Sequence, residues 1–318
     1  MISFISNSDM TRFVVKTVLY VLCVALVTVL LCALMLSVPN VDCRNSHEMN
    51  VSRSMERLKL AKGPKMVFIG GSGLAFGLKS KRVQEGVGMP VYNTGTHAGL
   101  GLGLQLALVK PYVGEGDLVV CVPEYQQYLG GFMYGNETAL RILSSSYPQG
   151  YRLVTLRQYV YLLRYVPDAF FSAISTRDGV PYGGPYSVSA LNEFGDVECY
   201  EHRNHVEDIQ VLPLNGPLQP RSISVLKDFD SFCAKQGARV LLLPPAYRRT
   251  AYYTNETRID EIWDMVKDSG LTTMSSPETY CFPDSCFFDT DYHLTEQGVD
   301  QRTERVISDI QAFMLLAR

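Results

Sequence analysis

The stretch Val67-Phe68-Ile69-Gly70-Gly71-Ser72-Gly73 joins an apolar run to a serine that is flanked by glycine on both sides. A short apolar run bounded by glycine is typical of a buried strand, and the glycines permit a tight turn after it. The pattern predicts a strand over residues 65–69, with Ser72 just beyond it and a helix following. A serine in that place is either a nucleophile, favoured by the positive field of a helix N-terminus, or an ordinary helix cap.

Strands and helices alternate along much of the remaining chain. Further strands are expected at residues 90–93, 118–122 and 238–243, and helices at 76–85, 101–113, 221–237, 258–269 and 295–316. Apolar strands that alternate with helices indicate a parallel sheet covered on both faces, so we expect a three-layer α/β/α, flavodoxin-like fold. Right-handed crossovers then bring the carboxyl ends of the strands to one edge, where ligands usually bind.

Residues 17–38 form an apolar run of 22 residues without a charge. As a helix, this run is long enough to cross a bilayer core of ~30 Å, whereas the apolar region of a cleavable signal peptide is usually only ~7–15 residues. We therefore predict an uncleaved single-pass anchor in the lipid bilayer. Basic residues flank the run almost equally, with Arg12 and Lys16 before it and Arg44 and Arg53 after it. The short N-terminus then favours a cytoplasmic segment over residues 1–16 and a periplasmic or extracellular domain.

The remaining chain divides by composition. Residues 39–63 are polar and charged, which predicts a linker or stalk, and residues 64–318 form the α/β domain. Residues of about 125–220 are rich in Tyr, Gly and Pro and break the alternation, so we expect an insertion at the ligand-binding edge, as a lid or a partner surface.

Charge and cysteine content exclude some classes of function. The net charge is only −3 and no block of like charge occurs, so a nucleic-acid partner has no electrostatic support. Of the eight cysteines, Cys281 and Cys286 are a close pair, which could form a local disulfide in an oxidising compartment or remain buried thiols in a reducing one. No second close pair occurs, and His202 and His205 lie in a charged loop, so no metal site is expected.

Nucleotide cofactors are not expected either. The dinucleotide fingerprint needs a third glycine or alanine where Phe76 stands, and the second expected strand ends in Asn93 rather than in an acidic residue. The glycine–lysine pair of a phosphate loop, followed by Ser or Thr, is also missing from the sequence.

A second stretch, Phe288-Asp289-Thr290-Asp291-Tyr292-His293-Leu294, precedes the last expected helix. A histidine at such a junction can reach across the sheet edge, and a nearby carboxylate can orient its ring and stabilise its charged form. Asp291 and Asp289 compete for that role, and we favour Asp291. The alternative is a surface turn that caps the last helix.

The order of these segments resembles the SGNH (GDSL-like) hydrolase superfamily, in particular its membrane-anchored branch of alginate O-acetylation proteins and the teichoic acid D-alanine transfer protein. Ser72 resembles the nucleophile block, Asn93 to Gly99 the glycine block, residues 119–124 the third block, and Asp291 to Leu294 the Asp/His block. The resemblance implies a catalytic Ser72, His293 and Asp291. It also implies an oxyanion hole of backbone N–H groups, which we assign to Gly73, Gly95 and Gly99.

Glu124 departs from the family pattern, because the third block usually supplies an asparagine to the oxyanion hole. A carboxylate there would repel a developing oxyanion unless it is protonated or turned away, so we expect Glu124 to hold a substrate hydroxyl instead. His97, in the glycine block, and Arg248, which follows a strand at the active edge, are further candidates for binding substrate.

These observations predict a membrane-anchored acyltransferase or esterase that acts on acetyl or other acyl esters of an extracytoplasmic polysaccharide or cell-envelope polymer. By resemblance, a multi-pass membrane O-acyltransferase is an expected partner. The alternative is a non-catalytic scaffold of SGNH-like fold, which the unusual Glu124 favours. A Ser72-to-His293 distance beyond about 5 Å would also favour the scaffold.

Overall fold

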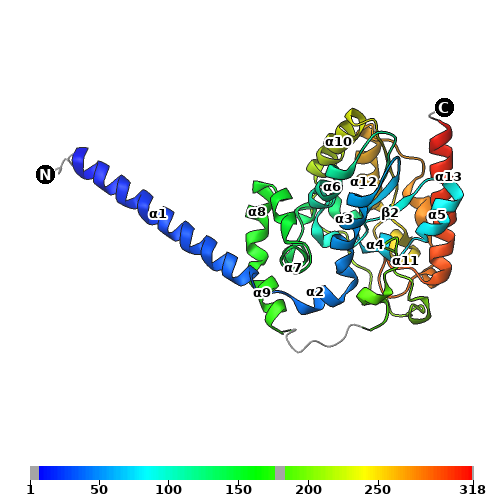
Figure 1. Cartoon of the computed structure of the whole chain (residues 1–318), viewed down its shortest axis with the longest axis horizontal. Coiled ribbons are helices and arrows are strands. Elements are labelled where there is room, and N and C mark those ends of the chain that lie inside the picture. Colours follow the sequence, from blue (N-terminus) through cyan, green and yellow to red (C-terminus); the bar gives the residue numbers. More distant parts are fainter. Residues whose placement is uncertain (1–6, 176–182, 317–318) are drawn as a thin grey trace.

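The computed structural model describes residues 7–175 and 183–316 (Figure 1). Residues 1–6 of the expected cytoplasmic segment and residues 176–182 of the expected insertion lie outside the described residues. The helices are α1 (Asn7–Leu36), α2 (Val41–Asn45), α3 (Asn50–Leu60), α4 (Ser72–Ala75), α5 (Ser80–Val87), α6 (Leu102–Val109), α7 (Glu137–Ser145), α8 (Leu156–Leu162), α9 (Val166–Ser175), α10 (Pro220–Lys235), α11 (Arg249–Thr254), α12 (Glu256–Asp268) and α13 (Glu296–Leu315).

Four parallel strands form the main sheet, in the order β2 (Val91–Asn93), β1 (Met66–Gly70), β3 (Leu118–Val122) and β4 (Arg239–Leu242). In this register, Phe68 of β1 lies between Asn93 of β2 and Val120 of β3. The predicted mixed α/β fold with a parallel sheet is therefore confirmed. A separate parallel pair, β5 (Tyr247–Arg248) and β6 (Cys281–Phe282), lies outside this sheet.

Successive strand residues contribute to two different apolar clusters, because side chains alternate between the faces of a sheet. Val67 and Val119 pack with residues of α3, α6, α10 and α12. Phe68 and Val120 pack instead with residues of α5 and α13. This packing fixes β1 at the centre of the sheet, so the turn after Gly70 is held between well-packed elements.

Helix α1 leaves the body of the protein as a long rod (Figure 1). Its segment Met10–Leu36 is long and apolar enough to span a membrane, and none of its most hydropathic window is buried in the protein. The structure thus has one N-terminal apolar helix of the expected kind, and the helix extends beyond the predicted 17–38 only at its N-terminal side.

The expectation of a linker over residues 39–63 is wrong. The segment folds into α2, a short 3-10 helix over His47–Met49, and α3. Val51, Met55 and Leu58 of α3 are buried at helical spacing, and they join the cluster that covers one face of the sheet. Arg53, Glu56 and Lys59 lie on the exposed face of this amphipathic helix. Other polar residues of the segment, His47, Glu48, Asn50 and Ser54 among them, are buried.

The expected insertion at residues 125–220 contains α7, α8 and α9, which lie near the base of α1 (Figure 1). Helix α7 packs against both α9 and α2.

Cys281 and Cys286, the closely spaced pair, are both free thiols.

Candidate active site

Ser72 is the first residue of α4, the short helix that follows β1, and Gly71 is its N-cap. The helix expected at 76–85 instead begins at Ser72, stops after Ala75 and resumes as α5. A Cβ at Gly71 would lie 2.1 Å from Oε1 of Glu124, so a larger residue there would have to displace that carboxylate. The tight turn therefore holds the Ser72 hydroxyl at the carboxyl end of the central strand.

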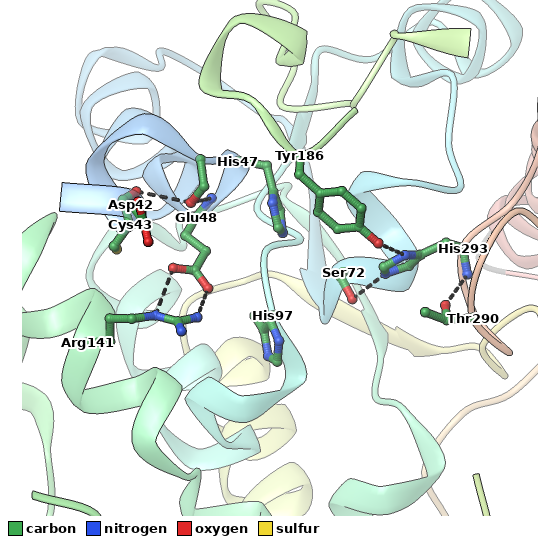
Figure 2. Close-up of a pocket in the computed structure, with 11 residues that line it drawn as sticks. Asp42, Cys43, His47, Glu48, Ser72, His97, Arg141, Tyr186, Thr290 and His293 are labelled. Atoms are coloured by element: carbon green, nitrogen blue, oxygen red, sulfur yellow. Dashed lines mark hydrogen bonds and ion pairs between the residues drawn. The ribbon is translucent and has the colours of Figure 1, made fainter. Parts of the chain in front are cut away.

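His293 lies against Ser72 (Figure 2), with its Nε2 2.8 Å from Oγ of Ser72. The imidazole is buried and stacks on Phe76, with ring centroids 4.2 Å apart. The backbone N–H of His293 donates to Oγ1 of Thr290 at 3.0 Å, which fixes the loop that carries the ring. A serine hydroxyl and an imidazole at this distance can exchange a proton.

The other ring nitrogen of His293 meets Asp289. Nδ1 of His293 lies 3.0 Å from Oδ1 of Asp289 and 3.0 Å from the hydroxyl of Tyr186, which also donates a short hydrogen bond to Asp289. Burial opposes ionisation, but the hydrogen bonds and charge of His293 and the Tyr186 hydroxyl hold the pKa of Asp289 below its ordinary value. Asp289 is therefore a charged group that can stabilise a protonated His293.

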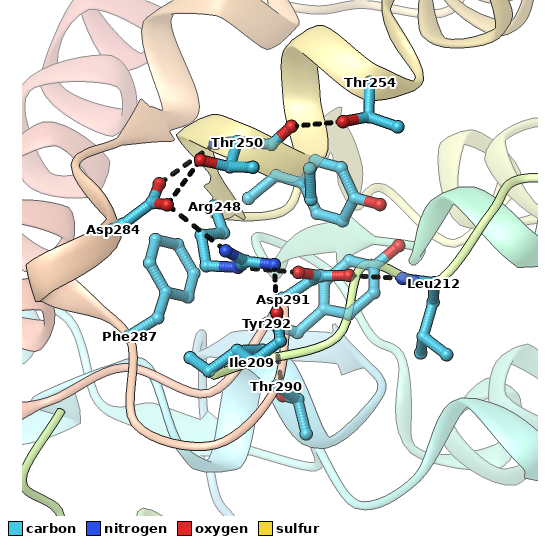
Figure 3. A network of polar contacts seen from close by, with 12 residues as sticks. Ile209, Leu212, Arg248, Thr250, Thr254, Asp284, Phe287, Thr290, Asp291 and Tyr292 are labelled. Atoms are coloured by element: carbon cyan, nitrogen blue, oxygen red, sulfur yellow. Dashed lines mark hydrogen bonds and ion pairs between the residues drawn. The ribbon is translucent and has the colours of Figure 1, made fainter. Parts of the chain in front are cut away.

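Asp291, the residue favoured from the sequence, points elsewhere (Figure 3). Within the described residues its carboxylate pairs with Nε of Arg248 at 2.8 Å and accepts a hydrogen bond from the backbone N–H of Leu212 at 3.0 Å. Thr290 explains the difference, because its Oγ1 accepts from the N–H groups of both Tyr292 and His293. This turn brings Asp289, the alternative in the sequence analysis, to the imidazole.

Arg248 is a buried structural residue, so its prediction as a substrate-binding residue is not supported. Its guanidinium contacts Asp291, Asp284 at 3.2 Å and the carbonyl oxygen of Ile209 at 2.9 Å. With two carboxylates and a carbonyl as partners, this guanidinium holds together the segments that carry Ile209, Asp284 and Asp291 (Figure 3).

Glu124 holds the turn that carries Ser72. Its Oε1 accepts a hydrogen bond from the backbone N–H of Gly73 at 3.1 Å, and it does not line the cavity at Ser72. Burial raises the pKa of Glu124 to about 7, partly offset by that N–H group and by the charge of Arg302. The predicted contact of Glu124 with a substrate hydroxyl is therefore replaced by a contact with the backbone.

The three glycines predicted for the oxyanion hole have their N–H groups occupied. Gly73 donates to Glu124, Gly95 donates to Oδ1 of Asn93 at 2.9 Å, and Gly99 donates to Nδ1 of His97 at 2.9 Å. In contrast, the backbone N–H of Ser72 has no hydrogen-bond partner within the described residues.

His97 lines the cavity, as its predicted role in binding requires. Burial lowers the pKa of His97, so the ring is neutral at pH 7. Because Nδ1 accepts a hydrogen bond from Gly99, the neutral ring carries its proton on Nε2 and offers a donor there.

The cavity at Ser72 has a volume of about 310 Å³, and Ser72, His97 and His293 are the lining residues that the sequence analysis named as site candidates. The lining residues that it missed include His47 and Glu48 from the segment after α1, Arg141 from α7 and Tyr186 from the expected insertion (Figure 2). Glu48 forms a two-point ion pair with Arg141.

His47 is buried, and within the described residues neither of its ring nitrogens makes a hydrogen bond of good geometry, although the nearby backbone of Tyr186 favours the charged form of the ring. Burial lowers the pKa of His47 to about 4. The only sequence signal for this part of the cavity was a His-Glu pair shortly after the apolar run.

Cys199, Glu201 and His202 could place ligand atoms within 4.8 Å of one another, as a metal site requires. Glu201 and His202 are exposed, and the thiol of Cys199 contacts both of them at 3.3 and 3.4 Å. None of these three residues lines the cavity at Ser72. His205 instead contacts the carbonyl oxygen of Phe287.

Comparison with known protein families gives no match for this chain, and no curated protein matches its sequence.

Proposed function

We propose that this chain is a membrane-anchored serine esterase or O-acyltransferase of SGNH (GDSL-like) type, with the three-layer arrangement of that superfamily. The observation that carries the proposal is the 2.8 Å contact between Oγ of Ser72 and Nε2 of His293, backed by Asp289 at Nδ1. Hydroxyl, imidazole and carboxylate in this order form the constellation that activates a serine for acyl transfer.

The reaction begins when Oγ of Ser72 attacks the carbonyl carbon of an acyl ester and Nε2 of His293 takes the hydroxyl proton. Asp289 stabilises the imidazolium that forms and keeps the ring oriented. His293 then gives the proton to the departing alcohol, which leaves an acyl group on Ser72. Water completes hydrolysis, or a second hydroxyl completes transfer, by attacking that acyl group with His293 as its base.

The oxyanion that develops in each step needs donors other than the predicted glycines. The backbone N–H of Ser72 is one, and Nε2–H of neutral His97, which lines the same cavity, is the second that we propose. Removing one such donor usually costs about 2.7–4 kcal/mol of barrier.

The substrate class rests on the resemblance and on the apolar helix α1. An acyl ester, of acetyl size or similar, on an extracytoplasmic carbohydrate or other cell-envelope polymer is the proposed substrate. A multi-pass membrane O-acyltransferase is the proposed partner. The cavity supports a polar substrate, because the Glu48–Arg141 pair and His97 lie in its wall.

A non-catalytic scaffold is the second candidate, and the occupied N–H groups of Gly73, Gly95 and Gly99 are the observation that favours it. A fluorophosphonate probe distinguishes the two functions, because it reacts only with an activated serine. We expect the full chain to be labelled and Ser72→Ala to be unlabelled. Ser224→Ala, a change at an exposed serine on α10, is the matched control and should be labelled like the parent. If the probe did not label the parent chain, the result would favour the non-catalytic scaffold.

A further inference from the structure

Residues 156–175, which comprise α8, one turn of 3-10 helix and α9, carry an exposed apolar stripe. Leu156 is 80% exposed, and the stripe continues through Val160, Leu163, Phe171 and Ile174, which are also exposed. The spacing of four, three, eight and three residues places these side chains on one face of a helix with 3.6 residues per turn. A contiguous exposed apolar surface of this kind marks an interaction site.

The opposite face of the same segment is attached to the protein. Gln158, Leu162, Val166, Ala169 and Ala173 are buried, and α9 packs against α7. The segment therefore has a protein-facing side and a second apolar side that the described residues leave exposed.

The stripe adjoins α1 (Figure 1). An apolar cavity of about 560 Å³ separates the two, lined on one side by Val29, Cys32 and Leu36 of α1 and on the other by residues that include Leu156, Val160 and Leu163. Val29 precedes Leu36 by about 10 Å along the helix, at ~1.5 Å per residue. Leu156 and its neighbours therefore lie beside the last turns of the apolar helix. If that helix spans the bilayer, they lie ~5–10 Å below the membrane surface, which is the depth that interfacial helices reach.

The polar residues in this segment and just before it fit a membrane surface. Arg152, Arg157 and Arg164 are exposed, against a single acidic residue, Asp168. Tyr159 and Tyr161 lie among them, and the guanidinium of Arg164 stacks on the Tyr161 ring. Tyrosine and arginine are the side chains that settle at the headgroup level, with apolar stems toward the lipid and polar ends toward water.

From these observations we infer that residues 156–175 lie in the bilayer interface as a second membrane contact, with lipid acyl chains filling the space between α8 and α1. The inference rests on the proposed anchoring of α1 in the membrane. Its consequence for the candidate site follows from α7, where Leu140 lines the space beside α1 and Arg141, the next residue, lines the cavity at Ser72. The cavity then lies one helix away from lipid, where it meets substrates held at the membrane surface.

Tryptophan fluorescence in vesicles tests the inference, because the one native tryptophan, Trp263, is buried and supplies a constant background. Full-length Leu156→Trp, Leu26→Trp and Leu315→Trp would be reconstituted in phosphatidylcholine–phosphatidylglycerol vesicles with and without brominated acyl chains. Leu26 reports on α1, and Leu315, which is 66% exposed at the end of α13, is the matched exposed leucine on the far side of the molecule.

We expect brominated lipid to quench Leu26→Trp and Leu156→Trp, and Leu156→Trp to lose at least roughly twofold more signal than Leu315→Trp. Suppose that brominated lipid quenches Leu26→Trp but quenches Leu156→Trp no more than Leu315→Trp. That result would overturn the inference, while the anchoring of α1 in the membrane would still hold. If brominated lipid did not quench Leu26→Trp, the result would contradict both the membrane anchoring of α1 and the inference. Iodide in the aqueous phase should give the reverse order, and efficient iodide quenching of Leu156→Trp would indicate a water-exposed or protein-docking face instead.

Discussion

Ser72 and His293 are 221 residues apart in the sequence, and Oγ of one lies 2.8 Å from Nε2 of the other. Ser72 follows the central strand β1, while His293 lies in the loop that leads into α13. Helix α13 packs against α5 on the same face of the sheet, so the loop before it returns to the carboxyl end of β1. The contact is thus a consequence of sheet topology, as the placement of ligand sites at strand ends in such folds leads one to expect.

Asp289→Asn and Asp291→Asn should separate the two aspartates of the loop. Asp289→Asn should lower kcat for hydrolysis of p-nitrophenyl acetate on the order of 10³-fold with little change in stability, because the amide cannot stabilise a charged His293. Asp291→Asn should keep most of the activity but lower the free energy of unfolding by about 3 kcal/mol, because it weakens a buried pair with Arg248. Steady-state kinetics measure the first effect and denaturant unfolding the second. If the two variants lost equal activity, Asp291 would also have to belong to the active site.

The choice between these aspartates shows where reasoning from sequence stops. Ser72 and His293 were identifiable because each lies at the boundary of an element that hydrophobic pattern predicts. Which carboxylate faces the imidazole depends instead on the hydroxyl of Thr290, whose contacts with two backbone N–H groups set the turn. No periodicity encodes such a turn.

The hydrogen bonds of the three predicted oxyanion glycines and the residues of the cavity wall could not be derived from the sequence, for a related reason. In sequence, Gly73, Gly95 and Gly99 look like free backbone, but Glu124, Asn93 and His97 accept their hydrogen bonds in the fold. His47, Glu48 and Tyr186 reach the site from segments that composition described only as polar or irregular, and only tertiary packing brings them together.

Tyr186→Phe tests whether the phenol supports His293 and Asp289. The hydroxyl contacts both groups, so its loss should lower kcat/KM by about tenfold, which corresponds to ~1–2 kcal/mol for a hydrogen bond to a charged group. KM should change little, since the phenol acts through Asp289 and the imidazole.

Tyr200→Phe is the matched control for this change, because the Tyr200 hydroxyl is buried without a hydrogen-bond partner in the described structure. It should retain the activity of the parent. If both variants lost activity equally, the effect of Tyr186→Phe would be one of packing rather than of its hydroxyl.

Met55→Ala tests the finding that residues 39–63 belong to the folded domain. Met55 is 3% exposed in the cluster beneath the sheet, so truncation should cost about 2–5 kcal/mol of the free energy of unfolding. Leu60→Ala is the control, because Leu60 ends the same helix at 77% exposure and its truncation should be nearly neutral. A linker would tolerate both changes, so a stable Met55→Ala protein would contradict the packing of α3.

Glu124→Gln should change how stability depends on pH. Burial raises the pKa of the folded-state carboxyl to about 7 from an ordinary value of 4.5, so the folded protein binds more protons than the unfolded chain between those limits. The contribution of this group to the free energy of unfolding is therefore fully present below about pH 4.5. It falls as the pH rises toward 7, by up to about 3 kcal/mol.

Glutamine at position 124 keeps an oxygen that can accept a hydrogen bond from Gly73, but it does not ionise. We expect Glu124→Gln to match the parent in denaturant unfolding at pH 4.5 and to exceed it at pH 8. A parent protein that gained stability relative to Glu124→Gln as the pH rose would mean that Glu124 is stabilised as a carboxylate, and that the raised pKa is wrong.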